Sequence, residues 1–221
     1  KEEIQTTRGR ANMLRAAISG ELPEEEIHSE RFQEEVLDLC VGCKGCASDC
    51  PTGVDLAKLK AEVKHQHHER EGSGLRERVF ADIDRLSALG SALAPVSNWA
   101  SKVPGARAAM ERVLGIAAER ELPEFRRETL VDWFEAREPG VSYVEADRKV
   151  LLFPDTYTNY NLPEAGKAAV EVLEAAGVHV AVPEGTAPSG RPAYSKGFLG
   201  KEADRARQNV ETLAPRVEDG W

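Results

Sequence analysis

The residues best suited to chemistry are the four cysteines of the chain, all within one eleven-residue segment: Cys40, Cys43, Cys46 and Cys50. Disulfides between neighbours this close would close small, strained loops, so metal ligation in a reducing compartment is the better interpretation. The spacing Cys-x2-Cys-x2-Cys-x3-Cys-Pro is typical of a segment that holds a [4Fe–4S] cluster. Gly42 and Gly45 would let the backbone approach the cluster and donate N–H groups to its sulfur atoms.

Structural zinc is the alternative metal, because thiolates also bind zinc. Zinc sites usually take their cysteines as two separated pairs, so a single short run favours iron–sulfur. Cys50 has two alternative roles. It either closes this cluster or ligates a second one, as the last cysteine of such a run does in two-cluster proteins. The second role requires cysteines upstream of Lys1, and we expect the chain to be a fragment of a longer protein.

The composition narrows the class of protein that carries this segment. The 221 residues, 41% hydrophobic and 30% charged, exclude global disorder and a disulfide-dependent miniprotein. The net charge of −9 repels phosphate backbones, so we expect no nucleic-acid partner. Without a spanning apolar stretch or a secretory signal, we expect a cytoplasmic protein. Trp99 and its apolar neighbours could contact a membrane surface, which would give peripheral membrane association, but packing on the core is favoured.

Helices are expected to position the cysteines. Apolar residues at helical spacing predict helices over about residues 6–20, over 24–39, and from 55 to a break at Gly72, the first with Thr6 or Thr7 as N-cap. Further helices, divided by prolines, are predicted over residues 76–138. From residue 148, two short apolar runs flank a helical stretch that begins at Asn161. This pattern predicts a βαβ unit with a first strand buried on both faces and a right-handed crossover.

Other side chains are weaker candidates for a functional role. His65 and His68 could share a helix face and bind a divalent metal, but a solvated helix face is the better interpretation. Arg8 and Arg10 could lie near a cluster, but surface positions are favoured. The polar segment 155–161 follows a strand, where α/β sheets bind ligands. It lacks phosphate-binding glycines, so we interpret it as structural capping.

Four segments carry a resemblance to a known family: TTRGRANMLR, CVGCKGCASDCPTGVDLAKLKAE, FPDTYTNYNLPEAGKAAVEVLEAAG and SGRPAYSKGFL. Over roughly residues 3–215 the chain resembles the C-terminal iron–sulfur region of FAD-linked oxidases of the glycolate oxidase and D-lactate dehydrogenase type. The resemblance implies an upstream FAD domain that oxidises a 2-hydroxy acid, on the same polypeptide or a separate subunit. It also implies two [4Fe–4S] clusters, one held by the cysteines of this chain and one sharing ligands with residues upstream of Lys1.

The resemblance implies an α plus α/β fold in three parts. These are an α-helical ferredoxin-like domain over residues 1–75, a helical connector over 76–140, and a truncated Rossmann-like βαβ domain over 141–221. The last part resembles the cysteine-rich domain of heterodisulfide reductase, in which the family usually has a Cys-Cys-Gly motif. This chain has Pro188-Ser189-Gly190 there, so we expect no cluster in the C-terminal part. Ser189 also lacks the strand–turn–helix context of a nucleophile.

The predicted function is electron transfer through the cluster, from the FAD domain to an unidentified acceptor. Substrate chemistry belongs to the flavin, so no catalytic residue is expected in this segment. One alternative is the iron–sulfur subunit of an anaerobic glycerol-3-phosphate dehydrogenase or of a heterodisulfide-reductase-like complex. An alternative of another class is a non-catalytic interaction module stapled by zinc.

Overall fold

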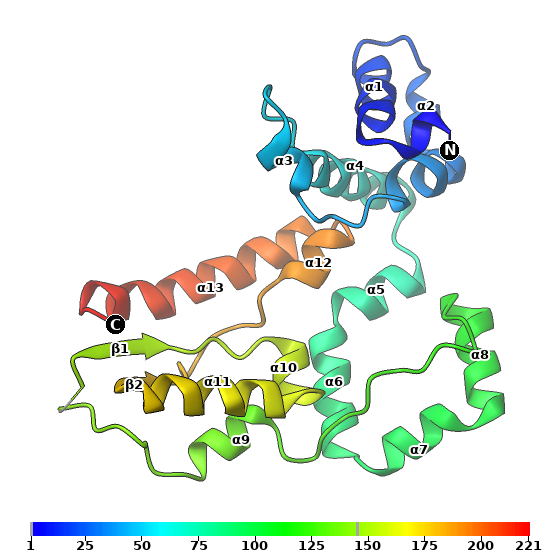
Figure 1. The fold of residues 1–221 in the computed structure, drawn as a ribbon. Coiled ribbons are helices and arrows are strands. Elements are labelled where there is room, and N and C mark those ends of the chain that lie inside the picture. Colours follow the sequence, from blue (N-terminus) through cyan, green and yellow to red (C-terminus); the bar gives the residue numbers. More distant parts are fainter. Residues whose placement is uncertain (1, 145) are drawn as a thin grey trace.

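The computed structural model describes residues 2–144 and 146–221 (Figure 1). Short helices form a bundle at the N-terminal end, and a small parallel sheet with flanking helices forms the C-terminal part. Further helices connect the two. The last long helix extends beside the sheet, and its beginning lies close to the N-terminal bundle.

The N-terminal bundle contains, in chain order, η1 (Glu3–Gln5), α1 (Thr7–Ile18), α2 (Glu24–Ile27), the π-helical η2 (Phe32–Asp38), α3 (Gly45–Asp49) and α4 (Leu56–Glu71). The predicted ends of the two long helices are confirmed. Thr6 Oγ1 accepts the Gly9 N–H at 3.0 Å at the start of α1, and Asp55 Oδ1 accepts the Lys58 N–H at 3.0 Å at the start of α4. Gly72, with φ +83°, ends α4.

The core of this bundle is a cluster of buried apolar side chains: Leu14, Phe32, Val36, Leu37 and Leu56. The prediction of one continuous helix over residues 24–39 is wrong, because Ser29 interrupts it. The Ser29 hydroxyl donates to the Glu26 carbonyl at 2.7 Å and accepts the Phe32 N–H at 3.1 Å. This interruption separates α2 from η2, which contributes three of the core side chains.

The connector contains α5 (Leu75–Ala81), α6 (Ile83–Ala92), α7 (Val96–Lys102), α8 (Pro104–Leu114) and α9 (Leu130–Glu135). Prolines divide these helices as predicted, since Pro95 precedes α7 and Pro104 is the first residue of α8. The segment between α8 and α9 returns to α6 and α7. Asn98 holds it there, because its side-chain amide exchanges two hydrogen bonds of 2.8 Å with the backbone of Phe125.

An apolar stripe on α6 and α7 faces solvent. Leu89, Leu93, Val96 and Trp99 are each more than half exposed, and Trp99 is 69% exposed. The prediction that Trp99 packs on the core is therefore wrong. In the part of the chain that the structure describes, no helix combines the length and the apolar character needed to cross a bilayer.

The C-terminal part is built on two parallel strands, β1 (Arg148–Leu151) and β2 (Val178–Ala181). They are connected by α10 (Thr156–Tyr160) and α11 (Pro163–Ala175), and β2 is followed by α12 (Arg191–Ser195) and α13 (Leu199–Glu218). The structure thus confirms the coarse fold prediction, a helical part followed by a small parallel βαβ unit.

Two local predictions in the C-terminal part are wrong. Asn161 does not begin the long helix; it ends α10, and α11 begins at Pro163, whose missing N–H suits the first helical turn. The first strand is not buried on both faces either. All four residues of β1 are at least partly exposed, because among the described residues β2 alone pairs with it.

The C-terminal helices pack on the N-terminal bundle and the connector. Gly197, with φ +80°, lies so close to α4 that an added Cβ would be 2.9 Å from the backbone nitrogen of His65. Lys201 on α13 forms an ion pair of 2.7 Å with Asp82, between α5 and α6. These contacts bring the segment around α12 close to the cysteines, although the two are about 150 residues apart in the sequence.

Candidate metal centre

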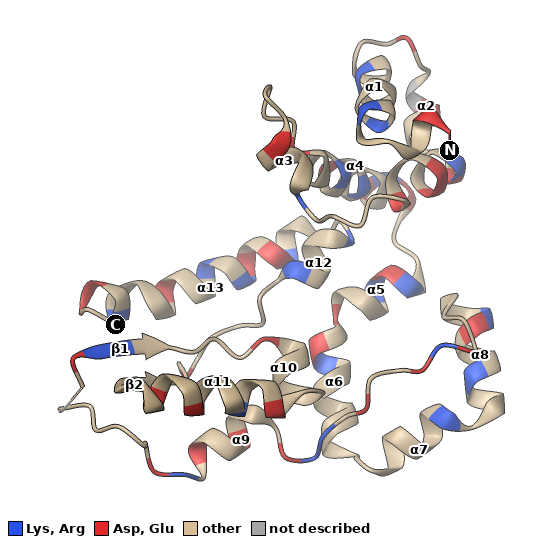
Figure 2. Ribbon diagram, in the orientation of Figure 1, with Lys and Arg blue, Asp and Glu red and all other residues tan. Residues whose placement is uncertain are grey.

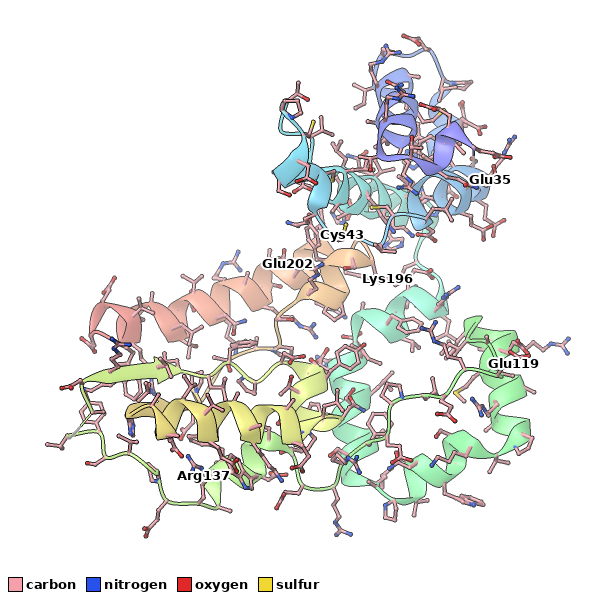
Figure 3. The ribbon with its side chains drawn as sticks, viewed as in Figure 1. Glu35, Cys43, Glu119, Arg137, Lys196 and Glu202 are labelled. Atoms are coloured by element: carbon pink, nitrogen blue, oxygen red, sulfur yellow. The ribbon has the colours of Figure 1, made fainter. Side chains whose placement is uncertain are left out.

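The cysteine segment leaves η2 through a tight turn. Gly42 and Lys44 have φ values of +68° and +62°, and Lys44 is the one non-glycine residue with a positive φ among the described residues. Cys43, between them, is exposed, whereas the other three cysteines are partly buried. Figure 3 shows Cys43 at the edge of the bundle that faces Lys196 and Glu202 of the C-terminal part.

Cys40 and Cys46 lie on the inner side of the segment, where both pack against the apolar core of the bundle. The sulfur of Cys46 accepts a hydrogen bond of 3.3 Å from the backbone N–H of Leu56, the first residue of α4. An N–H donor of this kind stabilises a thiolate ligand. Contacts within the bundle therefore hold two of the predicted ligands, Cys40 and Cys46, in place.

Cys50 follows α3 and meets a different set of donors. Its sulfur and the Thr52 hydroxyl are 3.1 Å apart in a hydrogen bond. The Thr52 hydroxyl, together with the backbone N–H groups of Val54, Thr52 and Gly53, lowers the pKa of the Cys50 thiol. The lowered pKa favours the thiolate of Cys50, which is the form of cysteine that binds a metal.

The cysteine segment supplies the donor atoms that a metal centre needs, but its side chains do not surround a common point in this structure. The four sulfur donors have the type and spacing of a cluster-binding segment, and the sulfurs of Cys46 and Cys50 each take part in a hydrogen bond. Within residues 2–144 and 146–221, no three His, Cys, Asp or Glu side chains converge enough to hold a metal ion. The residues present fit a thiolate-bound cluster in their chemistry, with Cys40, Cys43, Cys46 and Cys50 as the side chains that would hold it.

Two lysines of α4 lie behind the cysteine segment. Lys60 Nζ donates to the Cys40 carbonyl at 2.7 Å, and Lys64 Nζ lies 2.6 Å from a carboxylate oxygen of Asp38. Burial alone would raise the pKa of Asp38, but the hydrogen bond and charge of Lys64, together with the charges of Lys60 and Lys196, lower that pKa. Burial also lowers the pKa of Lys60. The ion pairs therefore anchor the residues that lead into the cysteine turn.

The C-terminal part reaches the cysteine turn through Arg191, whose guanidinium donates to the Gly42 carbonyl at 2.9 Å. Sequence reasoning missed this residue, because only the tertiary fold brings it to the turn. Ser189, which we expected to lack a nucleophilic role, is exposed and makes no hydrogen bond through its side chain in the described structure. The nearby segment therefore contributes contacts to the turn, with no thiolate of its own.

The histidines and arginines that are weaker candidates for a functional role lie in different parts of the structure. His65 and His68 are half-buried where α4 meets the C-terminal part, so the prediction of a solvated helix face is wrong; the His68 ring lies 4.9 Å from that of Phe198. Arg8 is exposed, as predicted. Arg10 is buried and donates to a backbone carbonyl, so the surface position predicted for it is wrong.

The segment 155–161 has the structural role that the sequence predicts. Asp155 Oδ1 accepts the Tyr157 N–H at 3.0 Å, which caps α10. Asn159 Oδ1 accepts the Val131 N–H at 3.0 Å and links α10 to α9. These side chains are therefore engaged in holding backbone groups.

The chain is similar to one of the subunits of the anaerobic glycerol-3-phosphate dehydrogenase of Escherichia coli (strain K12), with 27% identity over 76% of the chain and 41% of that protein. It is 23% identical to D-2-hydroxyglutarate dehydrogenase of Haemophilus influenzae over 82% of the chain and 18% of the relative. A third relative is a probable glycolate oxidase iron–sulfur subunit of Bacillus subtilis, 32% identical over 36% of the chain and 17% of that protein. No family model matches the chain, and no solved structure matches it significantly.

These relatives confirm, at modest identity, the resemblance to iron–sulfur regions associated with FAD-linked oxidases. They are oxidoreductases or subunits of oxidoreductases, which supports an oxidoreductase-associated role for the chain. The chain spans about two fifths of the length of the first relative and less than a fifth of the other two.

Proposed function

We propose that this chain carries electrons through a [4Fe–4S] cluster, from an FAD domain that oxidises a 2-hydroxy acid to a separate acceptor. The observation that carries the proposal is the cysteine run, in which the sulfur of Cys46 accepts a hydrogen bond from the Leu56 N–H and the sulfur of Cys50 is hydrogen-bonded to the Thr52 hydroxyl. The Bacillus subtilis relative is named as an iron–sulfur subunit of a glycolate oxidase. That name supports both the cofactor and the class of partner.

Each part of the cysteine segment has a role in this proposal. When bound, the cluster supplies one-electron transfer. Cys40, Cys43 and Cys46 hold it from one turn, while Cys50 either closes it or ligates a second cluster together with ligands from another segment or subunit. The N–H of Leu56 and the donors around Cys50 place partial positive charge beside the sulfurs. Such charge favours the reduced, more negative state.

The partner that delivers electrons is an FAD-binding domain on the same polypeptide or on a separate subunit. Two relatives are subunits by name, and the third is a dehydrogenase of which this chain spans 18%, so the relatives favour both arrangements. We assign residues 1–75 to an α-helical ferredoxin-like domain, 76–140 to a connector and 141–221 to a partial Rossmann-like domain. The cysteines of the chain would remain reduced in the cytoplasm, where we place the protein.

Metal analysis and optical spectroscopy of the anaerobically purified chain test the proposal. We expect brown protein with a broad absorbance near about 400 nm that decreases on reduction, because thiolate-to-iron charge transfer requires it. Colourless protein that holds zinc and no iron after anaerobic reconstitution would overturn the proposal. It would favour the zinc-stapled interaction module.

Serine variants test the separate roles of the cysteines. Cys43→Ser should abolish cluster incorporation, whereas Cys50→Ser should leave a labile cluster if Cys50 serves a second one. Ser48→Ala, on the exposed face of α3, is the matched control and should leave the iron content unchanged. Equal loss of iron in all four cysteine variants would instead show a single cluster closed by Cys50.

The exposed apolar stripe on α6 and α7 supports a further part of the proposal, peripheral contact with an anionic membrane surface. Residues 93–115 contain three Lys or Arg residues and one Glu, in a chain whose net charge is −9. Apolar side chains flanked by cations are typical of helices that lie in the membrane interface. Trp99, which is 69% exposed, is the side chain best suited to insert at the headgroup level.

Sedimentation with lipid vesicles tests this contact. The chain should bind vesicles that contain phosphatidylglycerol and not vesicles of phosphatidylcholine alone. Trp99→Ser should weaken binding several-fold, while Val210→Ser, at a 63% exposed position on α13, should not. Absence of binding to either vesicle, or an equal effect of the two variants, would contradict a membrane role for the stripe.

A further inference from the structure

A cavity of about 550 Å³ lies between the cysteine turn and the C-terminal helices. Its walls come from residues 38–44, from α4 and α5, and from residues 189–202 (Figure 3). The volume is within the range of small-molecule sites, which is about 300–1,000 Å³. Of the four cysteines, Cys40 alone lines it. The cavity therefore adjoins the proposed metal centre at Cys40 and extends away from the other three cysteines.

Cationic side chains outnumber acidic ones in its walls, which contain Lys44, Lys60, Arg76, Arg191 and Lys196 but only Asp38, Glu77 and Glu202. Basic residues of α12 and of the cysteine turn can be followed in Figure 2. Three of the cations already have partners. Lys44 lies 3.7 Å from a carboxylate oxygen of Asp55, and Lys60 and Arg191 donate to the backbone carbonyls of the turn.

The other two cations, Arg76 and Lys196, are different. Within the described part of the chain, neither forms an ion pair, because no carboxylate oxygen lies within 4.0 Å of its side-chain nitrogen atoms. Lys196 is partly buried, and this burial is the main cause that lowers the pKa of its ammonium group; the charges of Lys64 and Arg76 act in the same direction, and those of Asp38 and Glu77 oppose them. A partly buried cation without an ion-pair partner, such as Lys196, is stabilised by a bound anion. Arg76 is exposed, and its guanidinium can contact the same anion from the wall of the cavity.

We propose that this cavity binds a small organic anion bearing carboxylate or phosphate groups, with Arg76 and Lys196 as its main contacts. The fork of the Arg76 guanidinium can bind two oxygen atoms of such a group. Tyr194 adds an aromatic wall, and Lys44 Nζ lies 5.5 Å from the centre of its ring. The proposal depends on the cavity and its charges, and it does not require the cluster.

Calorimetric titration of the full chain tests the proposal with defined probes. Isophthalate represents a carboxylate ligand, phenyl phosphate a phosphate ligand, and isophthalamide a neutral molecule of similar shape. In a buffer of low ionic strength, at least one anion should bind and isophthalamide should not. The anion that binds more tightly identifies the group that the site prefers.

Variants locate the binding. Lys196→Gln and Arg76→Gln should each weaken anion binding at least tenfold, while Lys196→Arg should preserve most of it. Lys58→Gln removes a lysine on the exposed face of α4, outside the cavity, and is the matched control. Circular dichroism establishes that each variant is folded. Failure of both anions to bind at millimolar concentration would overturn the proposal, and so would an equal effect of Lys58→Gln and Lys196→Gln.

Discussion

The ion pair between Arg137 and Glu174 holds the connector on the C-terminal part. The two side chains are 21% and 10% exposed. Arg137 Nη1 donates to Glu174 Oε2 at 2.9 Å, and Nη2 donates to the other carboxylate oxygen, which also accepts the Gly140 N–H at 3.0 Å. One carboxylate on α11 therefore fixes the chain at two points between α9 and β1.

Arg137→Met should destabilise the protein, because it leaves the Glu174 carboxylate without its counter-ion. Breaking a buried ion pair costs about 3–5 kcal/mol. The Gly140 N–H remains and the site is not fully buried, so we expect a loss of roughly 2–3 kcal/mol. For a chain of this size, that corresponds to a fall in Tm of roughly 4–12 °C. Arg127→Met, at an exposed position, should change stability by less than about 0.5 kcal/mol.

The same ion pair makes stability depend on pH with a defined sign. The hydrogen bond from Arg137 is the main cause that lowers the pKa of Glu174 from its ordinary value of 4.5. A carboxylate with a lowered pKa contributes stability above its unfolded pKa, and this contribution is lost as the pH falls through the folded value. Glu174→Gln has no carboxylate to titrate. The difference in stability between the native protein and this variant should therefore decrease below about pH 4.5.

Urea unfolding at neutral and acidic pH, followed by circular dichroism, measures both effects. The reasoning would be refuted if Arg137→Met and Arg127→Met were equally stable at pH 7. It would also fail if the difference between the native protein and Glu174→Gln stayed constant from neutral pH down to pH values well below 4.5.

Three further changes test the packing and the site. Leu37→Ala, in the core behind the cysteines, should cost about 2–5 kcal/mol in urea unfolding and lower the iron content, because Leu37 is 1% exposed. Gly166→Ala should destabilise by about 1–2 kcal/mol, since its Cβ would lie 2.3 Å from a methyl group of buried Leu130; a gain in Tm would contradict this contact. Ser189→Ala should change electron transfer less than about twofold, or ~0.4 kcal/mol, and a large loss would reveal chemistry at that position.

Local signals in the sequence were sufficient for the helices that end in side-chain caps. Thr6, Asp55 and Gly72 mark the ends of α1 and α4 because their effects act within three or four residues. The interruption at Ser29 was missed, because a serine within an apolar pattern is compatible with a continuous helix. The burial of β1 was also predicted wrongly. Strand burial depends on how many strands and helices surround it, which a short apolar run does not specify.

The spacing of the cysteines was sufficient to identify them as candidate ligands, but it did not indicate which other residues lie around them. The Cys-x2-Cys-x2-Cys-x3-Cys run is a local pattern, and the assignment of these residues as cluster ligands stays a prediction. Arg191 could not be found in this way, since its bond to Gly42 joins residues 149 positions apart. Nothing in the sequence around Arg76 or Lys196 distinguishes these two residues from the other basic residues. Their importance depends on their position in the wall of one cavity and on the absence of an ion pair for either within the described structure, which are tertiary properties.

The contact between the two ends of the chain gives the C-terminal part a role that needs no metal ligand of its own. Pro188-Ser189-Gly190 contains no thiolate, yet Arg191 directly after it binds the backbone of the cysteine turn. Gly197 lets α12 approach α4, where a Cβ would be too close to the backbone. Because Cys43 remains exposed while Cys40 faces the cavity, the cover is one-sided. An anion in the cavity would therefore lie on the Cys40 side of the turn and leave the Cys43 side chain exposed.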